Sequence, residues 1–257
     1  MLKAYKYRIY PTKEQEILIS KTFGCVRFMY NKLLSDSQEE YKTKGKSKIF
    51  TPAKYKEEFQ WLKEVDSLAL CNAQMNVKTS FSNFFRKLKQ GKKGRKAGFP
   101  KFHSKHSGKK SYTTNSINNT IRIEDKRLRL PKVGLLDIVL HRYCIGTIKS
   151  ATISQNPNGA YYASILTDQV PPITSREINE ENIVGIDMSF SDCAVLSDGT
   201  KTKFQRWYRI SEKKLVKAQR TLSRRAKGSR NRSKARVKVA CIHQNISDQR
   251  KDFLNKL

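Results

Sequence analysis

The sequence predicts an α+β protein: a small β-barrel with an inserted helical region, then part of a second α/β domain with a basic helical hairpin. Short segments of alternating apolar residues lie at residues 2–10 and 120–167, and short strands separated by turn residues are typical of small barrels. Apolar residues at helical spacing occupy much of residues 12–95, between those two groups. A further apolar run begins at Ile183. The helical region is therefore predicted to be an insertion in the barrel.

The charge of the chain is strongly one-sided. Its 257 residues include 53 Lys and Arg but only 22 Asp and Glu, which gives a net charge of +31. So many cations repel one another unless a polyanion binds among them, so nucleic acid is the first partner to propose. A membrane surface is the competing polyanion. However, no apolar run approaches the length of a spanning helix, and the first residues do not form a signal peptide.

The cysteines bear on metal binding and on the redox environment. There are five, at positions 25, 71, 144, 193 and 241. They lie far apart and form no CxxC pair, which argues against a zinc ribbon and predicts no zinc in this chain. This spacing fits reduced thiols in a cytoplasm. The length allows two or three modest hydrophobic cores.

The first elements are a strand and three helical segments. Residues 2–10 alternate apolar and basic side chains and stop at Pro11, which predicts a strand with a basic edge. Thr12 can cap a helix that continues at helical spacing to about Tyr41. Two further helical segments are predicted, at residues 52–62 and 67–88.

The third helical segment carries an apolar stripe and a set of amides. Leu70, Val77 and Phe81 belong to the stripe. The polar side chains fall largely on other faces, and they are Asn72, Gln74, Asn76, Lys78 and Asn83. Amides suit bidentate hydrogen bonding with base edges, adenine especially. An ordinary solvated polar face is the alternative, because such faces are the norm on amphipathic helices.

Residues 86–110 differ in composition from the preceding helical segments, since they hold eleven Lys or Arg and no acid. A charge run of this length is usually a mobile, solvated segment. Phe99 and Phe102 stand among the lysines and instead favour a loop that orders on a phosphate backbone. Contacts of that kind position a ligand without reading its sequence.

Strand patterns then follow in quick succession. They are predicted at residues 120–124, 127–130, 135–142, 147–155 and 160–167. Together with the strand at the start of the chain, they suggest a barrel of the oligonucleotide-binding type. The sequence Val-Pro-Pro-Ile at 170–173 and the acid-rich residues 176–182 predict a linker to the next domain.

Residues 183–196 form the most distinctive stretch. An apolar β-branched run meets one acid, Asp187, and a second apolar run reaches Asp198-Gly199, a strong hairpin turn signal. A strand can hold a carboxylate rigidly enough to bind Mg²⁺ against a substrate phosphate, so Asp187 is a candidate metal ligand. The plainer interpretation of the three letters Gly-Ile-Asp is an Asp at a strand end with no chemistry.

A third strand is predicted at residues 202–208, followed by two helices. Ser211 is predicted to cap the first helix, which ends near Gly228, and residues 233–257 form the second. Sixteen Lys or Arg and one acid lie within residues 201–238. Because so long a basic block repels itself, it favours a helical hairpin that binds a polyanion over one whose charges are only solvated.

Four motifs, in this order along the chain, carry a resemblance to a known family. They are Tyr5 to Thr12, Asn83-Phe84-Phe85, Phe99-Pro100-Lys101-Phe102 with Ser111-Tyr112-Thr113-Thr114, and Val184-Gly185-Ile186-Asp187 with Ala194 to Gly199. With these motifs the chain resembles TnpB, the transposon-encoded RNA-guided DNA endonucleases from which compact type V CRISPR effectors descend. The match spans the whole chain.

The resemblance implies a domain organisation and a set of partners. It implies a wedge β-barrel at 1–11 and 96–175, a helical recognition insertion at 12–95, a linker at 176–182 and a partial RuvC-like, RNase H-fold domain at 183–257. It also implies a guide RNA, target double-stranded DNA, and a short target-adjacent motif read by the wedge and recognition domains. Asp187 would be the first metal-binding carboxylate. The expected location is the prokaryotic cytoplasm, at the nucleoid.

The predicted nucleic-acid contacts fall into two groups. A helix–barrel junction can present two sets of side chains to one groove, so the residues predicted to read the DNA motif are Gln74, Lys78, Thr113, Thr114 and Asn115. The residues predicted to contact the backbone are all basic: Lys6, Arg8, Lys92, Lys93, Arg95, Lys96, Lys101, Lys109, Lys110, Lys217, Arg220, Arg224, Arg225, Arg230 and Arg232.

The chain departs from the family after Asp187. No later acid stands in an apolar strand setting, no four-cysteine zinc finger follows, and the chain stops inside a helical stripe after three strands. One carboxylate cannot hold two Mg²⁺ ions, so Mg²⁺ is expected only if the nuclease site is complete. The chain alone is not expected to cut DNA.

Three functions stay open. The first is an RNA-guided, sequence-specific double-stranded DNA-binding protein that does not cleave and acts as a repressor. The second is the N-terminal part of an active, transposon-associated endonuclease. The third, less favoured, is a basic RNA chaperone with no DNA target. The reading frame beyond Leu257 separates the first two, and guide-dependent retention of DNA separates both from the third.

Overall fold

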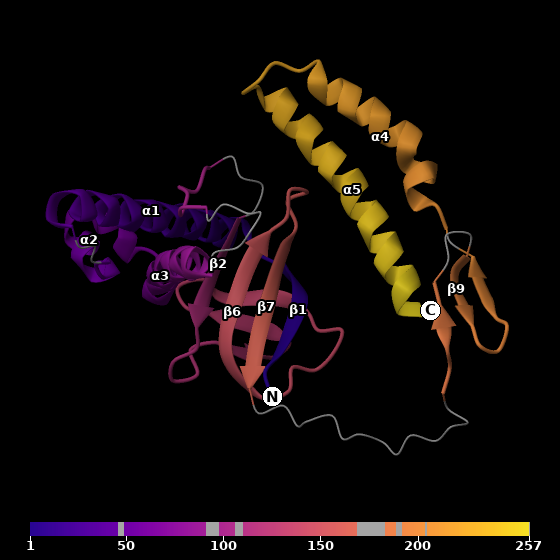
Figure 1. Ribbon diagram of the computed structural model, residues 1–257, viewed down its shortest axis with the longest axis horizontal. Coiled ribbons are helices and arrows are strands. Elements are labelled where there is room, and N and C mark those ends of the chain that lie inside the picture. The colour runs from indigo at the N-terminus through magenta and orange to yellow at the C-terminus, as the bar shows by residue number, and fades with distance from the viewer. Residues whose placement is uncertain are drawn as a thin grey trace. The chain divides into compact units, whose positions relative to one another are not determined.

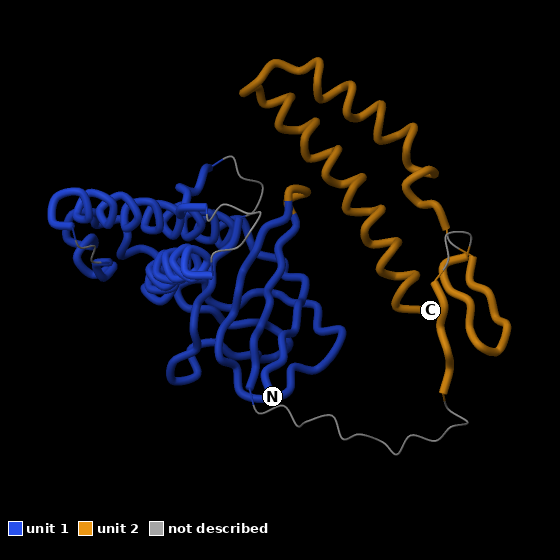
Figure 2. The backbone as a smooth tube through the Cα atoms, viewed as in Figure 1, with its two compact units in different colours: residues 1–156, 160–171 blue, residues 157–159, 172–257 orange. Residues whose placement is uncertain are grey.

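The structure is a computed structural model that describes residues 1–45, 49–90, 98–105, 110–168, 183–188, 192–203 and 205–256. The chain divides into two compact units, residues 1–156 with 160–171 and residues 157–159 with 172–257 (Figure 2). The first unit contains a curled β-sheet and a group of helices, and the second contains a small sheet and a helical hairpin (Figure 1). The predicted mixed α and β class is confirmed.

Seven antiparallel strands form the sheet of the first unit, in the order β2-β6-β7-β1-β5-β4-β3. Their bounds are β1 Lys3–Tyr10, β2 Lys110–Asn115, β3 Arg122–Glu124, β4 Arg127–Leu130, β5 Gly134–Val139, β6 Thr147–Gln155 and β7 Tyr161–Asp168. The strand predicted at the start of the chain is confirmed, and it pairs with both β7 and β5 at the centre of the sheet. The sheet curls into half a barrel (Figure 1), and no pairing joins its edge strands β2 and β3 within the described residues.

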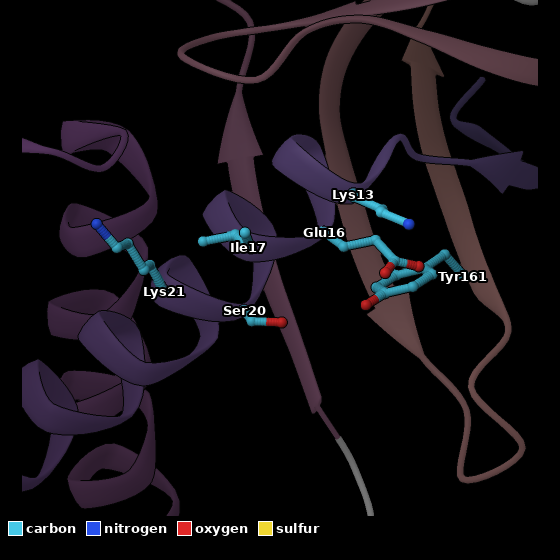
Figure 3. A pocket seen from close by; sticks show the side chains of 6 residues that line it. All are labelled: Lys13, Glu16, Ile17, Ser20, Lys21 and Tyr161. Carbon is cyan, nitrogen blue, oxygen red and sulfur yellow. The ribbon is translucent and has the colours of Figure 1, made fainter.

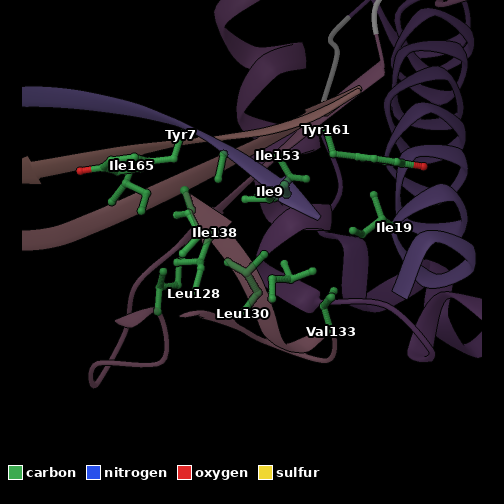
Figure 4. Close-up of a cluster of buried hydrophobic side chains, with 14 of the residues drawn as sticks. Tyr7, Ile9, Ile19, Leu128, Leu130, Val133, Ile138, Ile153, Tyr161 and Ile165 are labelled. Atoms are coloured by element: carbon green, nitrogen blue, oxygen red, sulfur yellow. The ribbon is translucent and has the colours of Figure 1, made fainter. Parts of the chain in front are cut away.

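One face of this curled sheet is buried. Tyr7 and Ile9 on β1, Ile153 on β6 and Ile165 on β7 are each at most 1% exposed (Figure 4). Helix α1 adds Ile19 to the same cluster. Because side chains alternate along a strand, the polar residues between these positions project from the opposite face.

Three helices and a 3₁₀ turn complete the first unit: α1 Lys13–Lys44, α2 Pro52–Glu58, η1 Gln60–Lys63 and α3 Ser67–Lys89. The predicted cap at Thr12 is confirmed, because its hydroxyl accepts from the backbone N–H of Gln15 at 3.3 Å and the Gln15 side chain accepts from Thr12 N at 3.0 Å. A second core, which includes the fully buried Met29, Leu34 and Leu70, holds α3 against α1.

The second unit contains a sheet of three short strands, β8 Ile186–Asp187, β9 Asp192–Leu196 and β10 Lys201–Lys203, in the order β10-β9-β8. The predicted turn at Asp198-Gly199 is confirmed, since Gly199 has a φ of +83° and its N–H donates to Leu196 O at 3.0 Å. Helices α4 Trp207–Ser223 and α5 Arg230–Lys256 form the predicted hairpin. Its core consists of four buried residues, Leu215, Ala218, Ile242 and Ile246.

Two predicted boundaries in this unit are wrong. The third strand ends at Lys203, and α4 begins at Trp207 without a side-chain cap, although the sequence predicted a strand to 208 and a cap at Ser211. The ring of Trp207 packs on Phe253 of α5 with centroids 5.1 Å apart. This contact favours the helix over a strand, although aromatic and β-branched segments fit strands well. In the first unit, β2 formed where no strand was predicted. The predicted linker at 176–182 lies outside the described residues.

Candidate nucleic-acid interface

Helix α4 presents a continuous row of cations, which we call the α4 stripe: Lys213, Lys217, Arg220 and Arg224. Their spacing of i, i+4, i+7 and i+11 puts them on one helix face, opposite the buried Leu215. They line a shallow groove of about 680 Å³. The single acid of this groove, Glu212, is paired with Arg209 at 3.2 Å. Within the described residues none of the four stripe side chains forms an ion pair. The positive charge of the stripe is therefore uncompensated and can bind an anion.

Arg232, which was predicted to contact the nucleic-acid backbone, instead binds carbonyl groups of the protein. Its Nη1 donates to Leu222 O at 2.8 Å and to Arg225 O at 2.9 Å. These carbonyls lie at and just after the end of α4, where a helix leaves acceptors unsatisfied. Arg232 therefore closes the turn of the hairpin, while Arg225 and Arg230 are exposed. Five further residues that were predicted to contact the backbone lie outside the described residues: Lys92, Lys93, Arg95, Lys96 and Lys109.

The exposed face of the first sheet carries Lys6 and Arg8, both close to the ring of Tyr162. Arg8 donates to the Tyr162 hydroxyl at 3.2 Å, and its guanidinium carbon lies 5.1 Å from the centre of the same ring. Lys6 Nζ lies 4.8 Å from that centre. The strand register continues the row from Lys6 through Ser164 and Thr152 to Thr113 on β2. This face therefore combines two cations, an aromatic ring and a row of hydroxyls.

The residues predicted to read DNA are distributed over both faces of β2 and over α3. Thr114 is 1% exposed, and its hydroxyl donates to Asp66, which also caps α3 by accepting from Leu68 N at 3.1 Å. Thr113 and Asn115 alternate to the opposite, exposed side of the strand. On α3, Gln74 Nε2 donates to Phe50 O at 2.9 Å, whereas Lys78 is exposed.

The structure therefore brings Thr113 and Asn115 onto the face that carries Lys6, and it does not bring Thr114 there. It confirms that α3 packs against β2 at a helix–sheet junction. The roles of these five residues in reading bases stay predictions.

Residues 98–105 rest on the helices of the first unit. Phe99 packs edge-on against Phe81 and Phe84 of α3, with centroids 5.7 and 5.2 Å apart. The backbone of His103 exchanges two hydrogen bonds with the Asn31 side chain, at 2.8 and 3.0 Å. The sequence pattern predicted that Phe99 belongs to a loop that orders on phosphate. In the structure the protein itself supplies the surface on which this residue packs, while Lys101 and Phe102 are exposed.

Two cavities of the first unit differ in charge. One, of about 610 Å³, lies beside α1 and β7 and is lined by Lys13, Glu16, Ile17, Ser20, Lys21 and Tyr161 (Figure 3). There Glu16 offsets one lysine, and Lys21 is paired with Glu64 at 2.6 Å. The other, of about 570 Å³, has Arg27, Lys105 and Lys110 but no carboxylate among its described lining residues. Only the second cavity is suited to an anion. Arg27 was not among the predicted contacts, because one arginine on an amphipathic helix gives no distinguishing pattern in the sequence.

Asp187 lies at the end of β8, opposite Val195 of β9. Asp187 is exposed, as are its apolar neighbours Ile186 and Met188, so the described strand does not bury this carboxylate. No three His, Cys, Asp or Glu side chains gather as a metal site in the part of the chain that the structure describes. One exposed carboxylate does not fit the two Mg²⁺ ions of phosphodiester hydrolysis. None of the described helices is long and apolar enough to cross a membrane.

Comparisons with known proteins identify the group to which this basic chain belongs. Two family models of the IS605 OrfB group, described as "Helix-turn-helix domain" and "Probable transposase", match residues 1–46 and 164–257, together more than half of the chain. The chain belongs to the TnpB family.

Two TnpB-like relatives match almost the whole chain. A protein of Streptomyces pristinaespiralis named "Putative RNA-guided DNA endonuclease" is 35% identical over 268 residues, which cover 99% of this chain and 63% of that protein. "Putative RNA-guided DNA endonuclease InsQ" of Escherichia coli is 29% identical over 263 residues, which cover 100% of this chain and 62% of that protein. This TnpB-family chain thus spans less than two thirds of the length of these relatives.

One solved structure, "Cryo-EM structure of the Cas12f1-sgRNA-target DNA complex", is 12% identical to this chain with a TM-score of 0.33. The match covers 100% of this chain and 68% of that chain. A score this low establishes no shared fold.

Proposed function

We propose that this TnpB-family chain is an RNA-guided, sequence-specific double-stranded DNA-binding protein that uses a guide RNA and a short target-adjacent motif. The observation that carries the proposal is the α4 stripe, four cations on one helix face without ion pairs in the described residues. They extend over about 16 Å of helix, a length that follows several backbone phosphates. The names of the two relatives supply the kind of nucleic acid.

The two units would divide this work. In this proposal the curled sheet, formed from 1–11 and 96–175, is a wedge barrel of the oligonucleotide-binding type, and the helices of 12–95 form the recognition insertion. The support is that β1 pairs with β5 and β7, although the whole helical segment separates these strands in the sequence. Residues 183–257 would form part of a RuvC-like domain of RNase H fold. Guide pairing would select the target, and protein cations would hold the backbones.

We further propose that this chain binds its target without cutting and acts as a repressor. The support is the exposed, isolated position of Asp187 among the described residues. The second candidate function is cleavage of the target DNA, which the names of both relatives favour. Mg²⁺ is the metal ion expected for that reaction.

The test is to load the chain with guide RNA and to measure retention and cleavage of matched and mismatched duplex DNA with Mg²⁺ present. We expect matched DNA to be retained intact, because no catalysis depends on the Asp187 carboxylate alone. We also expect Asp187→Ala to bind matched DNA as tightly as wild type does. Asp252→Ala, in an exposed acid of α5, is the control. Cleavage that disappears in Asp187→Ala but not in Asp252→Ala would establish the second candidate instead.

The exposed face of β2 gives a second test, of how the motif is read. Asn115→Ala should relax the preference among flanking DNA motifs by about 1–3 kcal/mol, because an amide reads base edges. Lys110→Ala should weaken binding to all motifs alike, because a phosphate contact carries no sequence information. A binding selection on randomised flanks measures both. If Asn115→Ala recovers the wild-type motif at the same stringency, the motif is read elsewhere.

A further inference from the structure

The basic cavity of the first unit lies where α1, α3, residues 98–105 and β2 meet. Its polar and aromatic lining includes Arg27, Tyr30, Asn76, His103, Lys105 and Lys110. Its volume of about 570 Å³ lies within the range of ligand sites, about 300–1,000 Å³.

Among the described residues, the cations of this cavity have no counter-charge. Arg27 is half-buried, and neither Arg27 nor Lys105 has a side-chain hydrogen bond or ion pair within the described residues. Lys110 Nζ donates to the amide oxygen of Gln155 at 3.3 Å, which leaves its charge uncompensated. A guanidinium holds its N–H donors in a rigid fork that matches phosphate oxygens. The described lining is therefore complementary to a phosphate group.

A rigid ring lies beside these cations. The rings of Tyr30 and His103 are stacked with centroids 3.9 Å apart and an angle of 3° between their planes. Tyr30 is 4% exposed and packs against the inner face of the His103 ring. His103 is exposed, and the outer face of its ring contacts no other ring in the described part of the chain. The two backbone bonds to Asn31 hold His103 in place. An aromatic face fixed in this way can stack a nucleic-acid base.

Two further features suit a base at this position. Partial desolvation of its inner face lowers the pKa of His103, which favours the uncharged ring at neutral pH and hence aromatic stacking. The side-chain amide of Asn76 has no partner among the described residues and can bond to a base edge.

We propose that this cavity binds one nucleotide of a nucleic-acid strand, with its phosphate held by Arg27 and Lys105 and its base stacked on the open face of His103. The proposal rests on the proposed function only in that the protein binds nucleic acid. A base inside a duplex has no free face, so the nucleotide must come from an unpaired segment. The guide RNA and an unpaired stretch of DNA are two sources of this chemistry.

The experiment uses the full chain and two single strands of one sequence, RNA and DNA, each carrying 5-iodouracil. After irradiation, mass spectrometry locates the cross-linked peptide, which we expect to contain His103, because this base couples to aromatic residues that it contacts. His103→Ala should lose the cross-link and about tenfold in affinity, whereas His103→Phe should restore the affinity. The strand that gives the stronger cross-link identifies the source of the nucleotide.

A salt titration tests the phosphate contact separately. Arg27→Ala should reduce the slope of log affinity against log salt concentration by about one. Arg129→Ala, which removes the same charge from β4 of the same unit, should leave the slope unchanged; this arginine is paired with Glu124. Thermal unfolding of each variant shows whether it is folded.

The proposal is overturned if cross-links from both strands map away from His103, or if Arg27→Ala and Arg129→Ala give the same slope in folded protein. Neither outcome affects guide-dependent binding of duplex DNA, which tests the proposed function by itself. Conversely, a wild-type chain that does not bind guide-matched DNA but still cross-links through His103 would contradict the proposed function and support the nucleotide site.

Discussion

The two units differ in how their described cations are partnered. In the first unit many cations have partners within the fold: Lys6 and Arg8 lie against Tyr162, and Lys21 is paired with Glu64. In the second unit sixteen Lys or Arg and one acid occupy residues 201–238, and the α4 stripe has no ion pairs in the described residues. Pairing in the first unit is only partial, because residues 86–110 of this unit hold eleven Lys or Arg and no acid. Both units therefore attract a polyanion, and they differ in how many of their described cations already have partners in the fold.

The hydrophobic cores of the two units also differ in size. The first unit has two clusters of buried residues, one under the curled sheet and one among α1, α2 and α3. The α4–α5 hairpin has four buried residues. Since buried apolar area is the main source of stability, the hairpin is the part whose stability depends most on a bound polyanion.

The largest effect is expected from the core of the first unit. Leu70 is fully buried between α3 and α1, so Leu70→Ala should lower the free energy of unfolding by about 2–5 kcal/mol. Leu254→Ala is the matched control, because Leu254 is 59% exposed on α5 and its loss should change stability by less than about 0.5 kcal/mol. Urea denaturation measures both. Equal losses would contradict the buried position of Leu70 in the core of the first unit.

The next effect concerns the hairpin. RNA at about one hundred times its dissociation constant should stabilise the segments that it contacts by about 2.7 kcal/mol. Hydrogen exchange should therefore slow more in α4 and α5 than in β6 and β7 when RNA is added. The double variant Arg220→Ala with Arg224→Ala should lose most of that protection. Protection confined to the sheet would contradict the comparison between the units.

Two arginines of the hairpin should separate folding from binding. Arg232→Ala removes two charge-assisted bonds to carbonyls at the turn, so it should lower the free energy of unfolding of the hairpin by about 1.5–3 kcal/mol and leave the salt slope unchanged. Arg220→Ala should do the reverse, with a slope smaller by about one and no change in stability. Thermal unfolding and salt titration of both variants measure this. Identical behaviour would mean that Arg232 also contacts phosphate.

Local signals predicted the elements that depend on neighbouring residues. The cap at Thr12 and the turn at Asp198-Gly199 are examples, since each is made within a few residues. The start of α4 was mispredicted because Trp207 is helical through its contact with Phe253, far along the chain. Strand β2 was missed because Lys110–Asn115 has a single large apolar residue, Tyr112, and gains its strand conformation from pairing with β6.

The basic surfaces were predictable as composition, but their geometry was not. The α4 stripe follows from helical spacing alone. The basic cavity draws Arg27, Asn76 and Lys110 from three elements, and only the packing of α1, α3 and β2 brings them together. Arg232 was predicted as a phosphate contact because its charge is visible in the sequence, whereas the carbonyls it binds are not.

The smallest effect concerns how the helices of the two units begin. At α1 the Thr12 hydroxyl and the Gln15 side chain satisfy each other's backbone N–H groups, and Gln15 Nε2 also donates to Leu135 O of β5 at 2.7 Å. Thr12→Ala should therefore cost about 1 kcal/mol. At α4 the N-cap residue Arg206 makes no side-chain cap bond, so Arg206→Ala should leave the free energy of unfolding unchanged. Denaturation of the two variants decides this, and a loss at Arg206 as large as that at Thr12 would mean that the start of α4 depends on its arginine side chain.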